Sequence, residues 1–384
     1  MKIAVPKEIR AGERRVGLVP ESVKKLVKAG IEVAIEAGAG DSAYIPDRNY
    51  EEAGARIERD LATLLREADF VLKVQPPVAD APAEVEQYRE GAMLLCTLMP
   101  TVNLDVVRQL VSRKISAFAT DCIPRTTRAQ SMDTLSSMAN IAGYKAVLIA
   151  ANELAKYFPM FMTAAGTIFA AKVFVIGAGV AGLQAIATAR RLGATVVATD
   201  TRKSVGEQIQ SLGAKFAGVE SEEDAETASG YAKALSEDFY RRQGQLIAEH
   251  CAGSDVVITT ALIGGVKAPR LITAEMVKAM QPGSVIVDLA ATAGGNCELT
   301  EPGKTVEKNG VRICAPLNLP SDMPLHGSTL YSRNLTTFVL EFWKEGAFKL
   351  DPEDEIISGA LVTHAGEVRH EPTRKALGGS EATS

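Results

Sequence analysis

The sequence predicts an α/β fold made of two doubly wound domains, and three observations lead to this prediction. The chain has 384 residues, enough for two domains of ordinary size that each bury a core. Short apolar segments alternate with amphipathic stretches of helical length, which is the pattern of parallel-sheet units. This series occurs twice along the chain, before and after a long apolar helical pattern.

The first series predicts five strands. Its apolar segments have strand length, and helical patterns such as those at residues 22–29 and 104–112 separate them. The strands are expected at residues 3–6, 33–36, 70–75, 93–98 and 115–119.

A long helix is expected between the two series. Residues 133–158 contain no proline, and apolar side chains occupy several faces at helical spacing, which is typical of a buried helix that joins domains. A further helix at 331–344 should pack on the first domain, and the small, polar tail at 373–384 should fray. The second series predicts six strands, at residues 173–176, 195–199, 214–217, 256–260, 285–289 and 311–315.

Composition and charge exclude several classes of protein. Hydrophobic residues make up 46% and charged residues 23%, as in ordinary globular proteins, which excludes disorder and collagen. The net charge is −5 and the lysines and arginines are dispersed, so no nucleic-acid partner is expected. The five cysteines lie far apart, without a C-x-x-C pair or a Cys/His cluster, so no metal site is expected.

The chain is expected to be cytoplasmic. Its first ten residues carry four charged side chains in a strand-like pattern, which fits neither a signal peptide nor a transit peptide. The most apolar region, residues 157–184, is interrupted by Lys172, proline and glycine before it is long enough to span a bilayer.

A glycine-rich turn follows the first strand of the second series. Residues 177–182 read Gly-Ala-Gly-Val-Ala-Gly, a helical pattern follows them, and Asp200 ends the next strand 18 residues after Gly182. Gly177 allows the tight turn, Gly179 leaves room for a pyrophosphate to reach backbone amides, and Gly182 lets the helix approach the sheet. This context predicts a Rossmann-type dinucleotide site. The plainer alternative is a turn without a ligand, with Asp200 as a cap at the strand end.

The acid at position 200 favours NAD(H) over NADP(H). Asp200 would accept hydrogen bonds from ribose hydroxyls and repel a 2′-phosphate, although Arg202 and Lys203 weaken this selectivity. The residues expected to bind the cofactor are Gly177, Ala178, Gly179, Val180, Gly182, Asp200, Thr201, Arg202, Tyr231, Ala261 and Leu262.

An acidic segment interrupts the second domain. Residues 220–226 are mostly acidic, and Ala-Ser-Gly-Tyr follows at 228–231. One interpretation is a solvated loop. The other is a mobile lid over the nucleotide, with Tyr231 as the side chain that contacts the ligand.

Several segments resemble the superfamily of alanine dehydrogenases and proton-translocating transhydrogenases. They are Pro-Lys-Glu at 6–8, Glu-Arg-Arg-Val at 13–16, Val-Leu-Lys-Val at 71–74, and residues 276–288, which end in Val-Ile-Val-Asp. The resemblance covers nearly the whole chain. It implies two Rossmann-like domains joined by long helices with a cleft between them: a discontinuous N-terminal domain, residues 1–133 and 320–384, and an inserted NAD-binding domain, residues 134–319.

The two branches of this superfamily differ in their need for an acid/base group. Oxidation of an amino acid requires one, and the positions that match the His and the Asp of alanine dehydrogenases are Met99 and Thr292 here, neither of which moves protons. Hydride transfer between two nicotinamide rings requires only orientation. Arg15 and Lys73 match pyruvate-binding positions, and they are interpreted either as substrate charges or as structural ion pairs.

Residues 125–144 resemble the Arg/Gln/Asp loop and following helix in the NAD(H)-binding component of proton-translocating transhydrogenases. The resemblance identifies Arg125, Gln130, Asp133 and Ser136 as the catalytic residues. It implies that Asp133 and Ser136 hold the nicotinamide ring and its ribose, and that Gln130 bridges toward the second nucleotide. Asp133 is also a suitable helix cap, but capping accounts for neither Arg125 nor Gln130.

The resemblance therefore implies Si-to-Re hydride transfer from NADH to NADP⁺ on an NADP(H)-binding partner component. A membrane-spanning component would couple this transfer to proton translocation. The chain is expected to form a homodimer, peripheral on the cytoplasmic face of the membrane. An amino-acid dehydrogenase like alanine dehydrogenase and a sensor of the NADH/NAD ratio are the alternatives.

Overall fold

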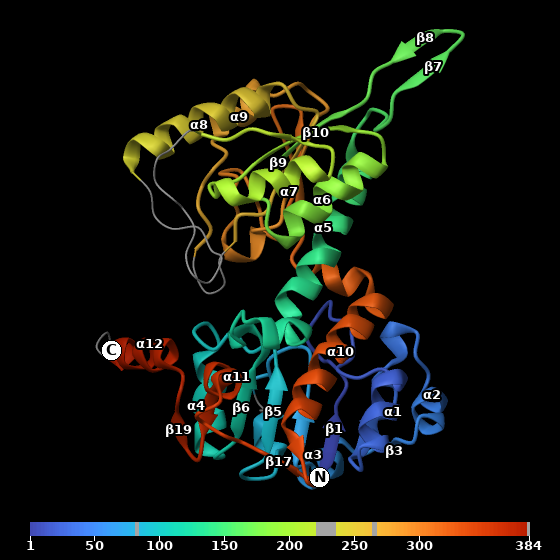
Figure 1. Cartoon of the computed structure of the whole chain (residues 1–384), viewed down its shortest axis with the longest axis vertical. Coiled ribbons are helices and arrows are strands. Elements are labelled where there is room, and N and C mark those ends of the chain that lie inside the picture. The colour runs from blue at the N-terminus through green and yellow to red at the C-terminus, as the bar shows by residue number, and fades with distance from the viewer. Residues whose placement is uncertain (81–83, 220–235, 263–266, 382–384) are drawn as a thin grey trace. The chain divides into compact units, whose positions relative to one another are not determined.

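The computed structural model describes residues 1–80, 84–219, 236–262 and 267–381 (Figure 1). The chain divides into two compact units: unit 1 is Met1–Met138 with Pro320–Ser384, and unit 2 is Ala139–Leu319. Each unit contains a mostly parallel sheet with apolar clusters on both faces. The predicted α/β class with two doubly wound domains is confirmed.

The sheet of unit 1 has the strand order β19-β18-β6-β5-β4-β1-β2-β3. The strands from β3 to β6 pair in parallel in the order 3-2-1-4-5-6, as in the Rossmann fold. β18 and β19 add two antiparallel strands at one edge. The bounds are β1 (Lys2–Val5), β2 (Glu32–Glu36), β3 (Arg56–Glu58), β4 (Phe70–Leu72), β5 (Met93–Cys96), β6 (Ser116–Ala119), β18 (Leu361–His364) and β19 (Glu367–Val368).

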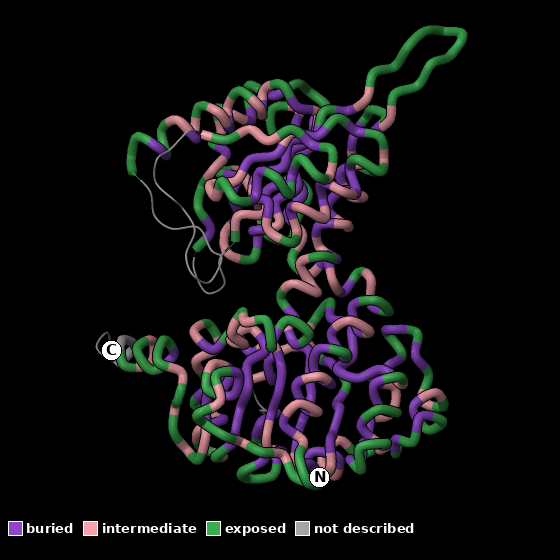
Figure 2. The backbone as a smooth tube through the Cα atoms, in the orientation of Figure 1, coloured by how far each residue is buried: buried purple, intermediate pink, exposed green. Residues whose placement is uncertain are grey.

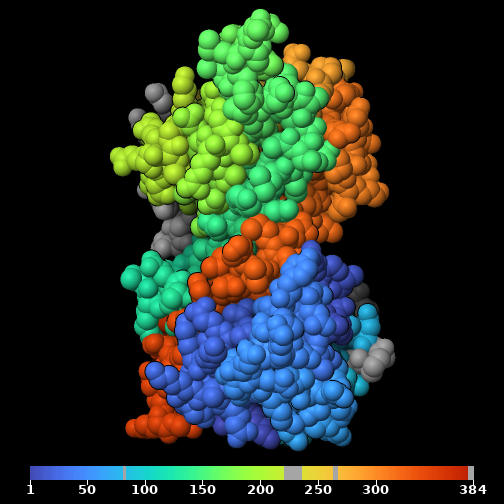
Figure 3. Space-filling view, turned by 90° about the vertical axis from the view of Figure 1, so that its right-hand side faces the viewer, coloured from blue at the N-terminus to red at the C-terminus, as the bar shows by residue number. Residues whose placement is uncertain are grey.

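The helices of unit 1 come from both ends of the chain. α10 packs against α1, and the space-filling view shows its orange residues beside the blue N-terminal ones (Figure 3). Tyr331 and Phe338 of α10 belong to the same buried cluster as Val5 and Leu18. The bounds are α1 (Pro20–Lys28), α2 (Asp47–Glu52), α3 (Leu61–Glu67), α4 (Leu104–Ser112), η4 (Thr127–Met132, a 3₁₀ helix), α10 (Pro324–Phe342), α11 (Glu355–Ala360) and α12 (Glu371–Glu381), and β16 (Trp343–Lys344) pairs with β17 (Ala347–Phe348).

The sheet of unit 2 has the order β11-β10-β9-β12-β13-β15-β14. It repeats the Rossmann order, and only its edge strand β14 pairs in an antiparallel way. The bounds are β9 (Lys172–Ile176), β10 (Thr195–Thr199), β11 (Lys215–Phe216), β12 (Val256–Thr259), β13 (Val285–Asp288), β14 (Thr305–Lys308) and β15 (Val311–Cys314).

Both faces of the second sheet are covered because the side chains of its strands alternate. Val173 and Val175 join an apolar cluster with helices α5 and α6, whereas Phe174 and Ile176 join one with α8 (Figure 2). In the described part of the chain, no helix combines the length and the apolar character needed to cross a bilayer. The bounds are α5 (Thr134–Glu153), α6 (Val180–Arg191), α7 (Gly206–Ser211), α8 (Glu237–Ala252) and α9 (Ala274–Ala279).

Several expected elements differ from the structure at their ends. The helix predicted at 133–158 is α5 and ends at Glu153, and the helix predicted at 331–344 begins earlier, at Pro324. Proline is favoured in the first turn, where a missing N–H removes no helical bond. The second series contains the six predicted strands and also β14, which was missed because its side chains are mostly exposed and form no apolar run.

The expectation of a frayed tail is wrong for the residues that the structure describes. The helix α12 runs to Glu381. The side chain of Thr373 is fully buried, and its hydroxyl lies 2.7 Å from Nδ1 of His370 at the start of this helix. Leu377 packs against the core of unit 1. Packing by a few side chains thus orders a segment whose composition is typical of a loose end.

The apolar region after residue 157 forms a hairpin that the sequence did not predict. β7 (Phe161–Thr163) and β8 (Gly166–Ile168) pair in an antiparallel way, and the hairpin projects from the body of unit 2 (Figures 1 and 2). All of its strand residues are exposed, and Met162 and Phe169 are each 80% exposed.

Candidate functional site

The glycine-rich turn connects the carboxyl end of β9 to α6. Gly177 has a φ of +92°, and a Cβ on Gly182 would lie 1.9 Å from the carbonyl oxygen of Gly177. A Cβ on Gly179 would meet nothing within 4 Å, so open space lies in front of this backbone. Among the described residues, no side chain caps the helix at Gly179, which leaves the amides of its first turn available to an anion. A pyrophosphate fits this turn, and Val180 begins the helix.

Asp200 lies directly after β10 and is already engaged by hydrogen-bond donors. Its Oδ2 accepts the N–H of Ala178 at 2.8 Å and Nη2 of Arg202 at 2.9 Å, and its Oδ1 accepts the N–H and Nε of Arg202, each at 2.9 Å. Burial by itself would raise the pKa of Asp200, but these bonds outweigh burial and lower it. The carboxylate is therefore charged, and a ribose that binds there must displace the Arg202 guanidinium. Thr201, between them, is half-buried.

Two side chains that the sequence analysis did not select hold the backbone next to the turn. The hydroxyl of Thr260 donates to the carbonyl oxygen of Gly177 at 3.0 Å. Asn296 is fully buried, accepts the N–H of Ala261 at 3.1 Å and donates to the carbonyl oxygen of Ala261 at 2.9 Å. These contacts fix Ala261 beside the turn, and the following Leu262 is 41% exposed.

The loop at 125–136 lies in unit 1 and leads into α5. Asp133 caps this helix: its Oδ1 accepts the N–H of Ser136 at 2.8 Å, and its Oδ2 accepts the Ser136 hydroxyl at 2.6 Å. The structure thus brings together two of the four residues expected to be catalytic. Arg125 and Gln130 are exposed on the same loop. Capping and a ligand-binding role are compatible, because both Asp133 and Ser136 remain partly accessible.

The positions that match the acid/base residues of alanine dehydrogenases carry none here. Met99 follows β5 with a φ of +44° and is 45% exposed. The neighbouring Asp121 accepts the N–H groups of Leu98 and Met99 at 2.7 and 3.0 Å, and burial raises its pKa. Asp121 is therefore committed to holding this turn. Thr292 is exposed after β13, within the 3₁₀ turn η6 (Ala291–Ala293) of unit 2.

Arg15 and Lys73 are neutralised inside unit 1. The guanidinium of Arg15 binds the Glu13 carboxylate, with Nε and Nη2 at 2.8 and 2.6 Å from its oxygens. Lys73 is 1% exposed, and its Nζ lies 2.8 Å from Glu84 and 3.8 Å from Glu8. This geometry favours structural ion pairs over substrate charges.

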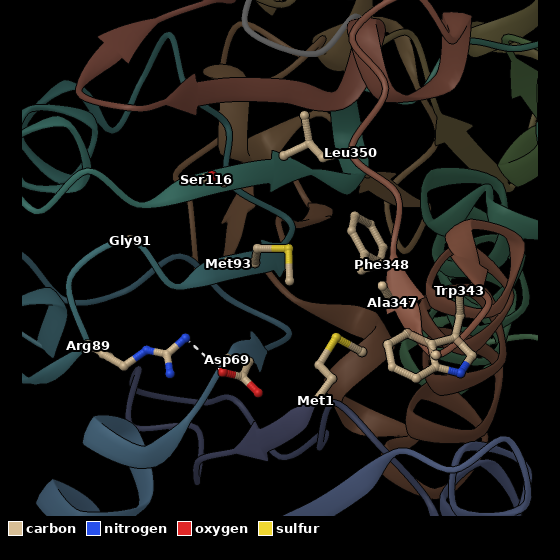
Figure 4. Close-up of a pocket in the computed structure, with 11 residues that line it drawn as sticks. Met1, Asp69, Arg89, Gly91, Met93, Ser116, Trp343, Ala347, Phe348 and Leu350 are labelled. Carbon is tan, nitrogen blue, oxygen red and sulfur yellow. Dashed lines mark ion pairs between the residues drawn. The ribbon is translucent and has the colours of Figure 1, made fainter.

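A hollow of about 410 Å³ lies at the opposite end of the first sheet (Figure 4). Met93 and Ser116, the first residues of their strands, line it together with the apolar Trp343 and Phe348. Ligands of open parallel sheets bind outside the carboxyl ends of the strands, so this hollow lies at the wrong end for the expected chemistry. The Arg89–Asp69 ion pair at its rim, 2.7 Å long, neutralises the polar groups there.

Tyr231 and the acidic segment at 220–226 lie outside the described residues. The other expected cofactor residues cluster in unit 2. The turn, Ala178, Asp200 and Arg202 are connected by hydrogen bonds, and Thr260 connects the turn to the strand that leads to Ala261. The donor set suits a dinucleotide: free amides for phosphate and a charged carboxylate for ribose.

Fold and site together define the class: a Rossmann-type α/β protein whose second unit carries a dinucleotide-binding fingerprint. Comparison with known families agrees with this class. Residues 4–142 match the family described as alanine dehydrogenase/PNT, N-terminal domain, and residues 146–371 match alanine dehydrogenase/PNT, C-terminal domain. The chain belongs to the alanine dehydrogenase/PNT family.

Individual relatives come from both branches of this family. The chain is 51% identical to an NAD(P) transhydrogenase subunit alpha chain of Rhodospirillum rubrum, over 96% of this chain and 98% of that one. It is 31% identical to an alanine dehydrogenase of Halomonas elongata, over 98% of this chain and 97% of that one. The crystal structure of a transhydrogenase from Sinorhizobium meliloti matches with a TM-score of 0.87 and 46% identity, covering 96% of this chain and 100% of that one.

Proposed function

We propose that this chain is the NAD(H)-binding component of a proton-translocating NAD(P) transhydrogenase. The observation that carries the proposal is the loop at 125–136, which presents Gln130 and the Asp133–Ser136 pair, while Met99 and Thr292 stand where an amino-acid dehydrogenase needs acid/base groups. The higher identity to the transhydrogenase relative than to the alanine dehydrogenase supports the same choice.

Unit 2 holds the dinucleotide in this proposal. The amides of the turn at 177–182 and the start of α6 bind the pyrophosphate, because a helix N-terminus favours negative charge. Asp200 takes the adenosine ribose hydroxyls after Arg202 moves off the carboxylate, and its charge disfavours a 2′-phosphate. Thr260 and Asn296 keep the adjoining backbone in place.

The loop in unit 1 is assigned to the nicotinamide end. Bound NADH supplies one hydride from C4, which goes to C4 of NADP⁺ on the partner component, so that NAD⁺ and NADPH are formed. Asp133 and Ser136 orient the ring and its ribose, and Gln130 contacts the second nucleotide. No side chain has to gain or lose a proton, so these residues act by orientation and exclusion of water, which lower a barrier by up to about 7 to 11 kcal/mol when the geometry is good.

Two measurements test this proposal. The purified chain should bind NADH and should not reduce NAD⁺ with alanine; alanine-dependent reduction would instead identify an amino-acid dehydrogenase. With the NADP(H)-binding component added, Gln130→Ala should slow single-turnover hydride transfer more than it weakens NADH binding. Gln281→Ala, at an exposed position before β13, is the matched control and should change neither. Equal transfer by Gln130→Ala and the native chain would refute the bridging role.

The proposal includes a membrane-spanning component and a peripheral position on the cytoplasmic face. The chain should then sediment with membranes that contain this component and remain in the supernatant with membranes that lack it. Sedimentation with both kinds of membrane, or with neither, would contradict this location.

A homodimer is also included in the proposal, and the hairpin β7–β8 supports it. An isolated two-stranded hairpin is at best marginally stable in water, and exposed apolar side chains such as Met162 and Phe169 favour burial against another surface. We assign that surface to a second copy of the chain. In light scattering, the native chain should have twice the mass of one chain, and Met162→Ser/Phe169→Ser should shift it toward the monomer. Tyr240→Ser, an exposed aromatic position on α8, should leave the mass unchanged.

A further inference from the structure

The 3₁₀ helix η4 presents Gln130 outward because its other face is buried. Ala129 and Met132 are each 1% exposed and belong to the core of unit 1. Residues three apart in a 3₁₀ helix lie on the same side, so Gln130 and Ser131 between them must point away from the core. Both are exposed. The direction of Gln130 is thus fixed by burial, but its exact position depends on what holds the backbone of η4.

One hydrogen bond from α10 holds this backbone directly after Gln130. The amide Nδ2 of Asn334 donates to the carbonyl oxygen of Ser131 at 2.8 Å, and Asn334 is only 7% exposed. Its Oδ1 is buried and has no hydrogen-bond partner among the described residues. A buried amide that leaves its acceptor unpaired is unfavourable for stability, so this residue is not explained by packing alone.

A second attachment lies two residues before Gln130. The Arg128 guanidinium lies 3.2 Å from Glu341 of α10 through Nε and 2.5 Å from Asp354 through Nη2. It also lies 5.8 Å from the ring centroid of Phe342. Asp354 in turn caps α11, since its Oδ1 accepts the N–H groups of the first turn. Arg128 therefore connects η4 to two helices of the C-terminal segment.

We infer that Asn334 and Arg128 are positioning residues for hydride transfer, which set the place of Gln130 from the C-terminal helices α10 and α11. The inference rests on the proposed role of Gln130 at the second nucleotide. Both attachments act on backbone or on charged side chains around Gln130 and leave its amide free to contact a ligand. A displacement of about 1 Å in such a group slows a reaction that depends on orientation by up to about a hundredfold.

The test compares transfer with binding in the full chain combined with the NADP(H)-binding component. Asn334→Asp keeps the shape but removes the donor to Ser131, and it should lower the single-turnover rate at saturating NADH at least tenfold, with the Kd of NADH within threefold of native. Arg128→Gln, at a partly exposed side chain that folding tolerates, should lower the rate about fivefold, and Arg128→Lys should recover part of this loss. NADH deuterated at C4 should show a larger isotope effect in both slow variants.

Arg333→Gln is the matched control. Arg333 precedes Asn334 on the same helix and pairs with the exposed Glu21 at 3.0 Å, so its loss should change neither rate nor binding. The inference is overturned if Asn334→Asp and Arg128→Gln transfer at the native rate, or if rate and NADH affinity fall in the same proportion. If Asn334→Asp does not fold, Arg128→Gln decides alone. A native chain that transfers no hydride at all would instead refute the proposed function.

Discussion

Replacing Asp200 by alanine should weaken NADH binding by about ten- to a hundredfold. Two hydrogen bonds from a ribose diol to a carboxylate contribute about 3 to 6 kcal/mol together, at about 1.5 to 3 kcal/mol each. In the free chain the same oxygens bind Nε and Nη2 of Arg202, and a bound ribose must replace these contacts. The released guanidinium is rehydrated, which we take to offset about half of the gain, leaving about 1.5 to 3 kcal/mol.

The assay is titration of NADH fluorescence at constant ionic strength, with circular dichroism to confirm folding. Asp255→Ala is the control: this acid lies before β12, at the other end of the sheet, where it binds Lys156 and the N–H of Lys172. It should lower the melting temperature without changing the Kd. Because the pKa of Asp200 is below its ordinary value, the carboxylate stays charged and NADH affinity should be constant from about pH 8 to pH 5.

Arg202→Gln sharpens the same prediction, because it removes the competing guanidinium. NADH should then bind up to about tenfold more tightly, by the amount that displacement of Arg202 otherwise requires. The reasoning is refuted if folded Asp200→Ala binds NADH within twofold of native, or if Arg202→Gln weakens binding, since the carboxylate would then not be the ribose acceptor or the guanidinium would itself contact the ligand.

Three further predictions concern stability. A Cβ on Gly143 of α5 would lie 2.1 Å from the carbonyl oxygen of residue 181, so Gly143→Ala should destabilise unit 2 by about 1 to 3 kcal/mol in urea, whereas Gly244→Ala on α8, with open space around it, should stabilise it by up to about 1 kcal/mol. The Arg15 contacts outweigh burial and lower the pKa of Glu13 to about 2 from 4.5, so this group should contribute up to about 3 kcal/mol above pH 4.5, which is lost as the pH falls toward 2 and is absent in Glu13→Gln. Burial lowers the pKa of His370, so hydrogen exchange of α12 should speed up as the pH falls below about 6.5 and the ring becomes charged.

The sequence predicts the elements whose determinants are local. The turn at 177–182 is recognisable because its glycines, the strand before it and the helix after it are contiguous, and the alternation of buried strands such as β9 makes a parallel sheet readable. The strand β14 and the hairpin β7–β8 are not readable in this way. Their side chains are mostly exposed, so neither follows a pattern of burial against the core of unit 2.

The features of the site that sequence reasoning misses depend on contacts between distant residues. Asn296 binds Ala261 and Pro269, which are 35 and 27 residues away in the chain, and no spacing rule identifies such a partner. The hydroxyl of Thr260 reaches a carbonyl oxygen 83 residues earlier. The only local signal for Asn296 is the pair of glycines before it, both with positive φ, which marks a tight turn without saying what the turn holds.

The contacts of α10 give a physical reason for the discontinuity of unit 1. The hydroxyls of Ser328 and Ser332 accept the N–H groups of Val16 and Val19, each at 3.0 Å and in buried surroundings, and the Tyr331 hydroxyl accepts the N–H of Thr97 at 2.9 Å. Without α10, these backbone donors would lose their partners, at a cost of about 1 to 3 kcal/mol for each one that remained buried. The helix that completes the polar contacts of the first sheet also carries Asn334, which binds η4. Folding of unit 1 and placement of the loop at 125–136 therefore depend on one C-terminal helix, so a chain that lacks it should lose both together.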